Sequence, residues 1–267
     1  MDHRLELISF WNIAPGSRVL ELGCGQGECT VALADAVGPE GHIDAVDPGS
    51  PEYGAPYTLS QSQSHLSAGP LGPRITWHLQ VDPLTYLKGL EEGTKYDYVV
   101  LSHCIWYFES PALLAALLTA LAPHTRTLCL AEWSLRACTA ATLPHVITAL
   151  LLASLESKRK IPSHGNVRTV LSPAQITKEV LGAGFKKVQE ETKASNEGLL
   201  DGYWEASYAL KTREKVLGAL KEEGVSEKEL GALVAMYDSV EQGVGLLEDG
   251  AKGVKAMDYW AGIFESS

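Results

Sequence analysis

Short apolar runs alternate with segments of helical spacing along most of the chain. The runs are filled largely by apolar residues, which predicts buried strands at 18–20, 42–47, 75–81, 96–101 and 126–132. Apolar positions three and four residues apart predict helices at 5–11, 29–37, 58–66, 84–90 and 111–122. Strands and helices in alternation predict an α/β fold with a mostly parallel sheet.

The pattern changes after residue 133. Segment 144–157 has the spacing of a helix, and segment 161–170 is a polar loop. Segments 185–193 and 203–210 alternate well enough to predict two antiparallel strands. From residue 211 the chain is charged and helical, with a capping box in the 226–229 tetrapeptide, so we expect a helical C-terminal extension over 211–267.

Composition narrows the class of protein. The 267 residues suffice for one large α/β domain with an appendage. The net charge of −11 disfavours a nucleic acid partner, because most of the surface would repel a polyanion. The five cysteines form no C-x-x-C pair, which fits a reducing compartment and gives no metal site. The longest apolar run, 111–123, is too short for a bilayer, so we expect a cytoplasmic protein without a membrane segment.

The stretch between the first strand and the next helix is the strongest candidate for ligand binding. It holds an acid at Glu21 and glycines at Gly23, Gly25 and Gly27. Glycine permits a tight turn and lets a ligand touch the backbone. The spacing departs from the dinucleotide fingerprint G-x-G-x-x-G, because Glu28 stands where the last glycine belongs. The acid Glu21 would repel a pyrophosphate and suits a ligand with a cationic end.

Two further acids follow the second and third strands. Asp47 lies 20 residues after Gly27, the offset at which such folds bind a ribose diol; alternatively it is an ordinary turn residue before Pro48. Asp82 closes the third strand and also fits the N-cap of a helix with Pro83 at its first position. Because ligands bind outside the carboxyl ends of parallel strands, both acids belong to one edge of the sheet.

The stretch from Arg18 to Trp133 resembles the class I S-adenosylmethionine-dependent methyltransferases. The acid-x-G-x-G-x-G turn, the two acids and the strand that begins Tyr96-Asp97 occur in that family's order. The resemblance implies a seven-stranded sheet of order 3-2-1-4-5-7-6, a methyltransferase domain over 1–210, and a substrate-covering segment inserted near 134–170. It implies S-adenosylmethionine (SAM) as cofactor and S-adenosylhomocysteine (SAH) as product. The implied cofactor-binding residues are Glu21, Gly23, Cys24, Gly25, Gly27, Asp47, Pro48, Val81, Asp82, Ser102 and His103.

Catalytic residues are poorly marked, because methyl transfer mainly needs positioning of the acceptor and, in some cases, removal of a proton. Histidine is the natural base near neutral pH, and we name His103 and His145 as candidates, with a structural histidine as the alternative for each. An aromatic residue could stack on a planar acceptor or hold a cation. Candidate acceptor-binding residues are Trp106, Tyr107, Glu132, Trp133, His164 and Arg168.

The sequence supports two interpretations of function. The first is a SAM-dependent methyltransferase acting on an oxygen or nitrogen of a small molecule. The tetrapeptide DPPY or NPPY of enzymes that methylate adenine or glutamine is absent, since Ser102-His-Cys-Ile stands there. The second is a protein of the same fold that binds SAM without methylating, such as a cyclase, a pericyclic catalyst or a regulatory subunit. Whether the chain forms a homo- or heterodimer stays open.

Overall fold

The computed structural model describes residues 1–161 and 165–266. Within these residues, seven strands form one sheet in the order β3-β2-β1-β4-β5-β7-β6. Strands β1 to β5 are parallel, and β7 runs antiparallel to both of its neighbours, β5 and β6. The α/β class and the sheet order predicted from the sequence are confirmed. The strands are β1 (Arg18–Leu22), β2 (His42–Asp47), β3 (Ile75–Leu79), β4 (Tyr96–Ser102), β5 (Thr125–Trp133), β6 (Phe185–Lys193) and β7 (Tyr259–Ser266).

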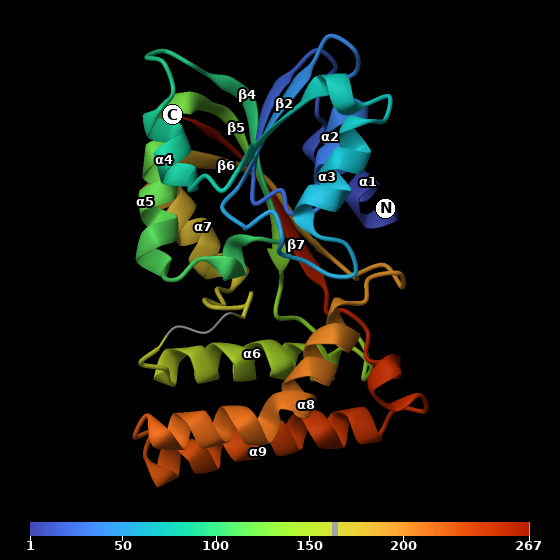
Figure 1. The fold of residues 1–267 in the computed structure, drawn as a ribbon, viewed down its shortest axis with the longest axis vertical. Coiled ribbons are helices and arrows are strands. Elements are labelled where there is room, and N and C mark those ends of the chain that lie inside the picture. Colours follow the sequence, from blue (N-terminus) through green and yellow to red (C-terminus); the bar gives the residue numbers. More distant parts are fainter. Residues whose placement is uncertain (162–164, 267) are drawn as a thin grey trace.

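Helices cover both faces of the sheet and form a third layer at one end (Figure 1). The helices α1, α2 and α3 lie on one side, and α4, α5 and α7 on the other, while α6, α8 and α9 pack together below the carboxyl ends of the parallel strands. Their bounds are α1 (Asp2–Trp11), α2 (Glu28–Ala36), α3 (Leu59–Ser67), α4 (Pro83–Lys88), α5 (Pro111–Leu121), α6 (Leu143–Lys158), α7 (Pro173–Gly182), α8 (Asp201–Glu222) and α9 (Glu227–Gly245).

Local capping explains where several helices begin. Thr58, Ser172 and Ser226 each accept a hydrogen bond from the backbone three residues on, and the glutamine or glutamate at that position reaches back, which completes a capping box. Asp82 caps α4 through the backbone N–H of Thr85. None of the described helices is both long and apolar enough to cross a lipid bilayer.

The last strand of the sheet differs from the sequence prediction. Segment 203–210 lies inside α8 and is not a strand, because its buried positions, Ala206 and Ala209 after Gly202, have helical spacing. The missing strand is β7, whose first four residues are buried and which pairs with β5 from Trp133↔Tyr259 onward. The C-terminal extension expected over 211–267 is helical in the rest of α8 and in α9, but its final residues form β7, a strand of the sheet. A domain boundary at residue 210 stays a prediction.

Candidate active site

The glycine-rich turn joins β1 to α2 in a backbone conformation that needs glycine. Gly23, Gly25 and Gly27 have φ values of +73°, +53° and +91°, in the left-handed region. A Cβ on Gly23 would lie 2.7 Å from the Cβ of Cys104, and one on Gly27 would lie 2.7 Å from Cη2 of Trp77. A Cβ on Gly25 would meet nothing within 4 Å. The turn is therefore packed on the protein side at its two ends and open at Gly25.

Asp47 fastens this turn to the end of β2. Its Oδ2 accepts a hydrogen bond from the Gly25 N–H at 2.8 Å, and its Oδ1 accepts one from the Gly49 N–H at 2.7 Å. Pro48 between them is exposed. Each carboxylate oxygen has a further lone pair, so Asp47 keeps the capacity to accept from two hydroxyl groups.

The neighbouring strand brings Val81 and Asp82 to the same edge. The Val81 N–H donates to the Asp47 carbonyl oxygen at 3.3 Å. Asp82 is exposed, and its Oδ1 accepts from the Thr85 N–H at 3.0 Å as the cap of α4. The structural role that the sequence indicated for Asp82 is thus present, and the carboxylate remains exposed at the edge where the ligand is expected.

Glu21 lies beneath the turn. Its side chain is 1% exposed, and its Oε2 accepts from the Thr30 hydroxyl at 2.5 Å. Burial raises the pKa of Glu21 to about 7, against the opposing effect of the Thr30 hydrogen bond. The Glu21 side chain joins β1 to α2 from inside, and the direct contact with a cationic ligand expected from the sequence stays a prediction.

The end of β4 carries Ser102 and His103, and the first turn of α1 lies over both. Arg4 donates from Nη1 to the Ser102 hydroxyl at 3.3 Å, and the Nε2 atoms of His3 and His103 are 2.8 Å apart. His103 has a left-handed φ of +52°, and its backbone N–H donates to the Ala131 carbonyl at 2.9 Å. Cys24 is buried in the glycine turn nearby. His3 and Arg4 were not among the residues predicted from the sequence.

His103 stands between aromatic and acidic neighbours. Its ring centroid is 4.4 Å from that of Trp133, and its Nδ1 is 3.7 Å from Oε1 of Glu132. The Nδ1 atom is buried and has no hydrogen-bond partner among the described residues. Burial holds the pKa of His103 well below its usual range, and the positive charge of Arg4 adds to this effect. The ring is therefore neutral at physiological pH, which a general base requires.

Glu132 braces the backbone that follows β4. Its Oε2 accepts from the Trp106 N–H at 3.2 Å, and its Oε1 accepts from the Trp133 N–H at 2.9 Å. It is 1% exposed, and burial raises its pKa to about 7 despite these hydrogen bonds. Both oxygens thus accept hydrogen bonds from the backbone, so Glu132 positions the loop that follows β4.

His145 on α6 is fully buried and held at both ring nitrogens. Its Nδ1 accepts from the Met257 N–H at 2.9 Å, and its Nε2 lies 3.3 Å from Oε2 of Glu205. Because Nδ1 accepts a hydrogen bond, the ring proton is on Nε2, towards Glu205. These contacts tie α6 to α8 and to the segment before β7. A catalytic role for His145 stays a prediction, and its contacts here are structural.

The aromatic residues after β4 divide between core and surface. Trp106 is 1% exposed, and its indole N–H donates to the Leu171 carbonyl at 3.0 Å, so its ring is part of the core. Tyr107 is 48% exposed, so of these two adjacent aromatic residues it is the one that an acceptor could contact. Trp133 is buried between His103 and His145, with ring centroids 4.4 and 5.2 Å away.

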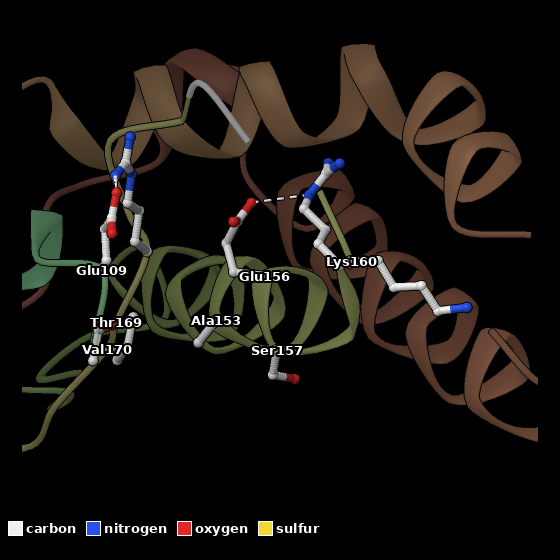
Figure 2. Close-up of a pocket in the computed structure, with 9 residues that line it drawn as sticks. Glu109, Ala153, Glu156, Ser157, Lys160, Thr169 and Val170 are labelled. Atoms are coloured by element: carbon white, nitrogen blue, oxygen red, sulfur yellow. Dashed lines mark hydrogen bonds and ion pairs between the residues drawn. The ribbon is translucent and has the colours of Figure 1, made fainter. Parts of the chain in front are cut away.

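Arg168 lines a cavity of about 470 Å³ between α6 and the loop that precedes α7, shown in Figure 2. Its Nη1 donates to Glu109 at 2.9 Å, and its backbone N–H donates to the Trp106 carbonyl at 2.8 Å. His164 lies outside the described residues. The cavity is lined by Glu109, Ala153, Glu156, Ser157, Arg159, Lys160, Arg168, Thr169 and Val170.

The long connection after β2 reaches across to this same loop. The Tyr53 hydroxyl donates to the Asn166 side-chain oxygen, and Gln26 in the glycine turn donates to the Tyr57 carbonyl at 2.6 Å. Gln63 on α3 donates to the Gly25 carbonyl at 2.7 Å. The connection therefore lies beside the glycine turn, at the edge of the sheet where the cofactor is expected.

The arrangement fits SAM on three observations. The turn is open at Gly25, where a ligand can approach the backbone. Asp47 and Asp82 present carboxylates at the carboxyl ends of neighbouring strands, as recognition of hydroxyl and amino groups requires. SAM contains no phosphate, whereas a phosphate group would be repelled by the acidic side chains around the glycine turn. The fold is Rossmann-like, and the residues at the carboxyl edge of its sheet fit a ligand of the SAM type.

Comparison with known proteins agrees. The sequence matches the family described as methyltransferase domain over residues 1–190, and the chain belongs to this family of SAM-dependent methyltransferases. Methyltransferase phomM' of Diaporthe leptostromiformis is 27% identical, over 91% of this chain and 71% of that protein.

Two solved structures have a similar fold. A cyclopropane-fatty-acyl-phospholipid synthase-like protein from Lactobacillus casei is 28% identical, with a TM-score of 0.82 over 99% of this chain and 89% of that chain. The phosphoethanolamine N-methyltransferase 2 of Haemonchus contortus, solved with SAM, is 13% identical with a TM-score of 0.51, over 99% of this chain and 52% of that chain. The second likeness concerns the fold alone.

Proposed function

We propose that the protein transfers the methyl group of SAM to an oxygen or nitrogen of a small molecule. The observation that carries this proposal is the turn open at Gly25 together with Asp47, whose two oxygens are fixed by the Gly25 and Gly49 N–H groups. A carboxylate held in this way is preorganised for a ribose diol, because binding requires no rotation of its side chain.

The chain's own residues divide the tasks of such a site. Backbone atoms of Gly23 to Gly27 would hold the amino-acid end of the cofactor, Asp47 would accept from the ribose hydroxyls, and Val81 and Asp82 would hold the adenine. When bound, SAM supplies an electrophilic methyl group on a sulfonium that leaves readily. The protein has to hold the acceptor in line, exclude water and accept a proton where the acceptor carries one.

His103 is the candidate base. Its ring is neutral, it stands at the end of β4 beside the cofactor turn, and Glu132 lies 3.7 Å from its Nδ1. An acceptor hydroxyl or ammonium would give up its proton to this imidazole, and the Glu132 carboxylate would stabilise the resulting cation. In this structure the Nε2 of His103 is in contact with His3, so the proton acceptor becomes available when that contact opens.

A small acceptor fits the charge of the protein better than a nucleic acid does. The net charge of −11 repels a polyanion, and the sequence contains no long basic run that would attract one. Tyr107 offers an exposed ring close to the end of β4, where a planar or cationic acceptor could rest. The alternative is a protein that binds SAM and catalyses another reaction, since one fold hosts many chemistries.

The first experiment is a calorimetric titration of the purified chain with SAH, with NADH as the control ligand. We expect binding of SAH and none of NADH. Asp47→Ala should lose about 1–3 kcal/mol of binding free energy, because it removes a charged acceptor from two hydroxyls. The matched control is Asp35→Ala, which removes an exposed carboxylate from α2. Failure of the wild-type chain to bind SAH would refute the proposal.

A second experiment separates transfer from binding alone. The chain is incubated with SAM carrying an isotopically labelled methyl group and with mixtures of phenols, amines and carboxylic acids, and products are detected by mass. Label in a phenol, amine or acid product supports the proposed function. Binding of SAH with no labelled product in any mixture would favour the alternative.

A further inference from the structure

The first turn of α1 brings one cation to the edge of the glycine turn. The guanidinium of Arg4 donates from Nη1 to the Ser102 hydroxyl at 3.3 Å and from Nη2 to Oε2 of Glu28 at 3.5 Å. Its side chain is 17% exposed, whereas that of Glu28 is 70% exposed. Both hydrogen bonds to described residues are long, so a group with five donors is held by two weak contacts.

Glu28 is the first residue of α2, and this helix end is suited to an anion. The N-cap is Gly27, which has no side chain to accept from the first turn of the helix. The N–H groups of that turn have no intrahelical acceptor, and the helix dipole favours negative charge there. Arg4 contacts the first residue of this helix, so it lies next to a helix end that favours negative charge, and Glu28 is the carboxylate that it contacts there in this structure.

We propose that Arg4 binds the carboxylate of the amino-acid end of SAM, and that the Glu28 side chain gives up this contact when the cofactor binds. The inference rests on the proposed function, since it assigns one more residue to the same cofactor. It adds a determinant from α1, outside the glycine turn and the acids after β2 and β3, and it names the chemical group that the residue recognises.

Charge and geometry support this assignment. The amino-acid end of SAM carries one carboxylate and one ammonium group. The described residues of the glycine turn and of the end of β4 offer acids and backbone atoms, and Arg4 is the cationic side chain that contacts them. Arg4 contacts Ser102 from one side and the start of α2 from the other, so it spans the two elements that border this end of the cofactor. A planar guanidinium can hold a carboxylate through two parallel hydrogen bonds, which the 3.5 Å contact with Glu28 does not achieve.

The test compares two ligands that differ only in the carboxylate. The chain is titrated calorimetrically with SAH and with decarboxylated SAH, which keeps the amine, the thioether and the adenosine. We expect Arg4→Gln to weaken SAH binding about ten- to a hundredfold, the range of a lost charge-assisted hydrogen bond, and to change the binding of the decarboxylated ligand by less than about twofold. Arg4→Lys keeps the positive charge but lacks the two parallel donors of the guanidinium, so its affinity for SAH should lie between those of the wild-type chain and Arg4→Gln.

Three controls make the result specific. Arg126→Gln removes an exposed arginine near the start of β5 and should leave both affinities unchanged. Glu28→Gln removes the competing carboxylate and should bind SAH at least as tightly as the wild-type chain does. Thermal unfolding of each variant checks that the fold persists.

The outcomes separate the inference from the function on which it rests. If the wild-type chain binds neither ligand, the proposed function fails and the inference fails with it. If the wild-type chain binds SAH but Arg4→Gln weakens both ligands equally, or neither of them, the cofactor assignment stands and the carboxylate contact is refuted.

Discussion

The Nε2 atoms of His3 and His103 lie 2.8 Å apart, although the two residues are separated by 100 positions in the sequence. Two ring nitrogens at this distance must share one proton, since two N–H groups would repel and two lone pairs would form no bond. The Nδ1 of His103 faces Oε1 of Glu132 at 3.7 Å, which favours a proton on that Nδ1. His3 is then the donor and His103 the acceptor, an assignment inferred from the hydrogen-bond network.

We expect the imidazole rings of His3 and His103 to stay neutral under mildly acidic conditions. Burial lowers the pKa of His3 to about 2, and the positive charge of Arg4 adds to the effect. Burial also lowers the pKa of His103. Both groups bind protons more weakly in the folded chain than in the unfolded chain, so their contribution to stability is lost as the pH falls below the ordinary value of 6.5.

The measurement is nitrogen NMR of the histidine side chains at about pH 6, with His3→Gln and His103→Gln used to assign the signals. We expect the pattern of a neutral ring for both, with the His103 proton on Nδ1. An imidazolium pattern for either residue would contradict the assignment.

Glu21 predicts a pH dependence of the opposite sign. Burial raises its pKa from the ordinary 4.5 to about 7, so the folded chain binds its proton more tightly than the unfolded chain does. Its contribution to stability is complete below pH 4.5 and is lost as the pH rises towards 7, on the order of 1–3 kcal/mol. Glu21→Gln cannot titrate, and it should gain stability relative to the wild-type chain between about pH 5 and pH 8.

Thermal unfolding of both chains across this range measures the difference. Burial also raises the pKa of Glu132, which remains in the variant. The dependence of the unfolding temperature on pH should therefore be weaker in Glu21→Gln than in the wild-type chain, but not absent. Unfolding temperatures of the two chains that run parallel from pH 5 to pH 8 would show that Glu21 titrates normally.

Most of the sheet was predictable because its signals are local. The five parallel strands are short runs of largely apolar residues, and the glycine turn and the acids after β2 and β3 lie at fixed offsets from them. Segment 203–210 misled because Tyr203 and Trp204 suggest a strand, whereas Ala206 and Ala209 decide the buried face. The strand β7 lies 65 residues beyond β6 along the chain, and its place in the sheet follows from tertiary pairing, which no local pattern encodes.

The site was predictable to the extent that it sits at strand ends. His3 and Arg4 come from α1 and reach the end of β4 only in three dimensions, so no sequence spacing indicated them. Trp106 looked like an acceptor-binding residue, but its ring fills the core beside Leu171 and leaves Tyr107 exposed. Which of two adjacent aromatic residues is buried depends on the short 3-10 turn Ile105–Tyr107, whose geometry the sequence did not specify.

Gly25 and Gly27 should respond differently to alanine. Both have a positive φ, which costs an alanine about 1–2 kcal/mol. A Cβ on Gly27 would also lie 2.7 Å from Trp77 and 2.6 Å from Leu66, so Gly27→Ala should lose about 2–5 kcal/mol of stability. A Cβ on Gly25 meets nothing within 4 Å, and it projects from the open side of the turn.

Gly25→Ala should therefore keep most of its stability while its affinity for SAH falls at least about tenfold, because the added methyl group takes space next to the ligand. Gly16→Ala is the matched control, since Gly16 has a φ of +77° and nothing within 4 Å of a Cβ, and it lies before β1. Calorimetry and thermal unfolding of the three variants test this. A Gly25→Ala chain that binds SAH as tightly as Gly16→Ala does would remove this position from the cofactor site.

Asp44 stabilises the sheet without taking part in the site. It is 6% exposed in the middle of β2 and accepts from Arg18 Nη2 at 3.0 Å and from the Tyr96 hydroxyl at 2.9 Å, with His78 Nε2 at 3.0 Å on its other oxygen. Burial raises the pKa of Asp44, but the hydrogen bonds from His78, Tyr96 and Arg18 outweigh it and lower the pKa below 3.8. The stabilisation is therefore complete above pH 3.8 and is lost as the pH falls further.

Asp44→Asn should lose about 1.5–3 kcal/mol at neutral pH, because it removes a charged acceptor from these donors. For a chain of this size the unfolding temperature should fall on the order of 3–10 °C. The gap to the wild-type chain should narrow as the pH drops below 3.8, and the affinity for SAH should stay within about twofold, since Asp44 lies inside the strand and Asp47 at its end. Asp35→Asn, an exposed carboxylate on α2, controls for the change in charge. An Asp44→Asn chain as stable as this control at neutral pH would show that the hydrogen bonds of Asp44 do not offset its burial.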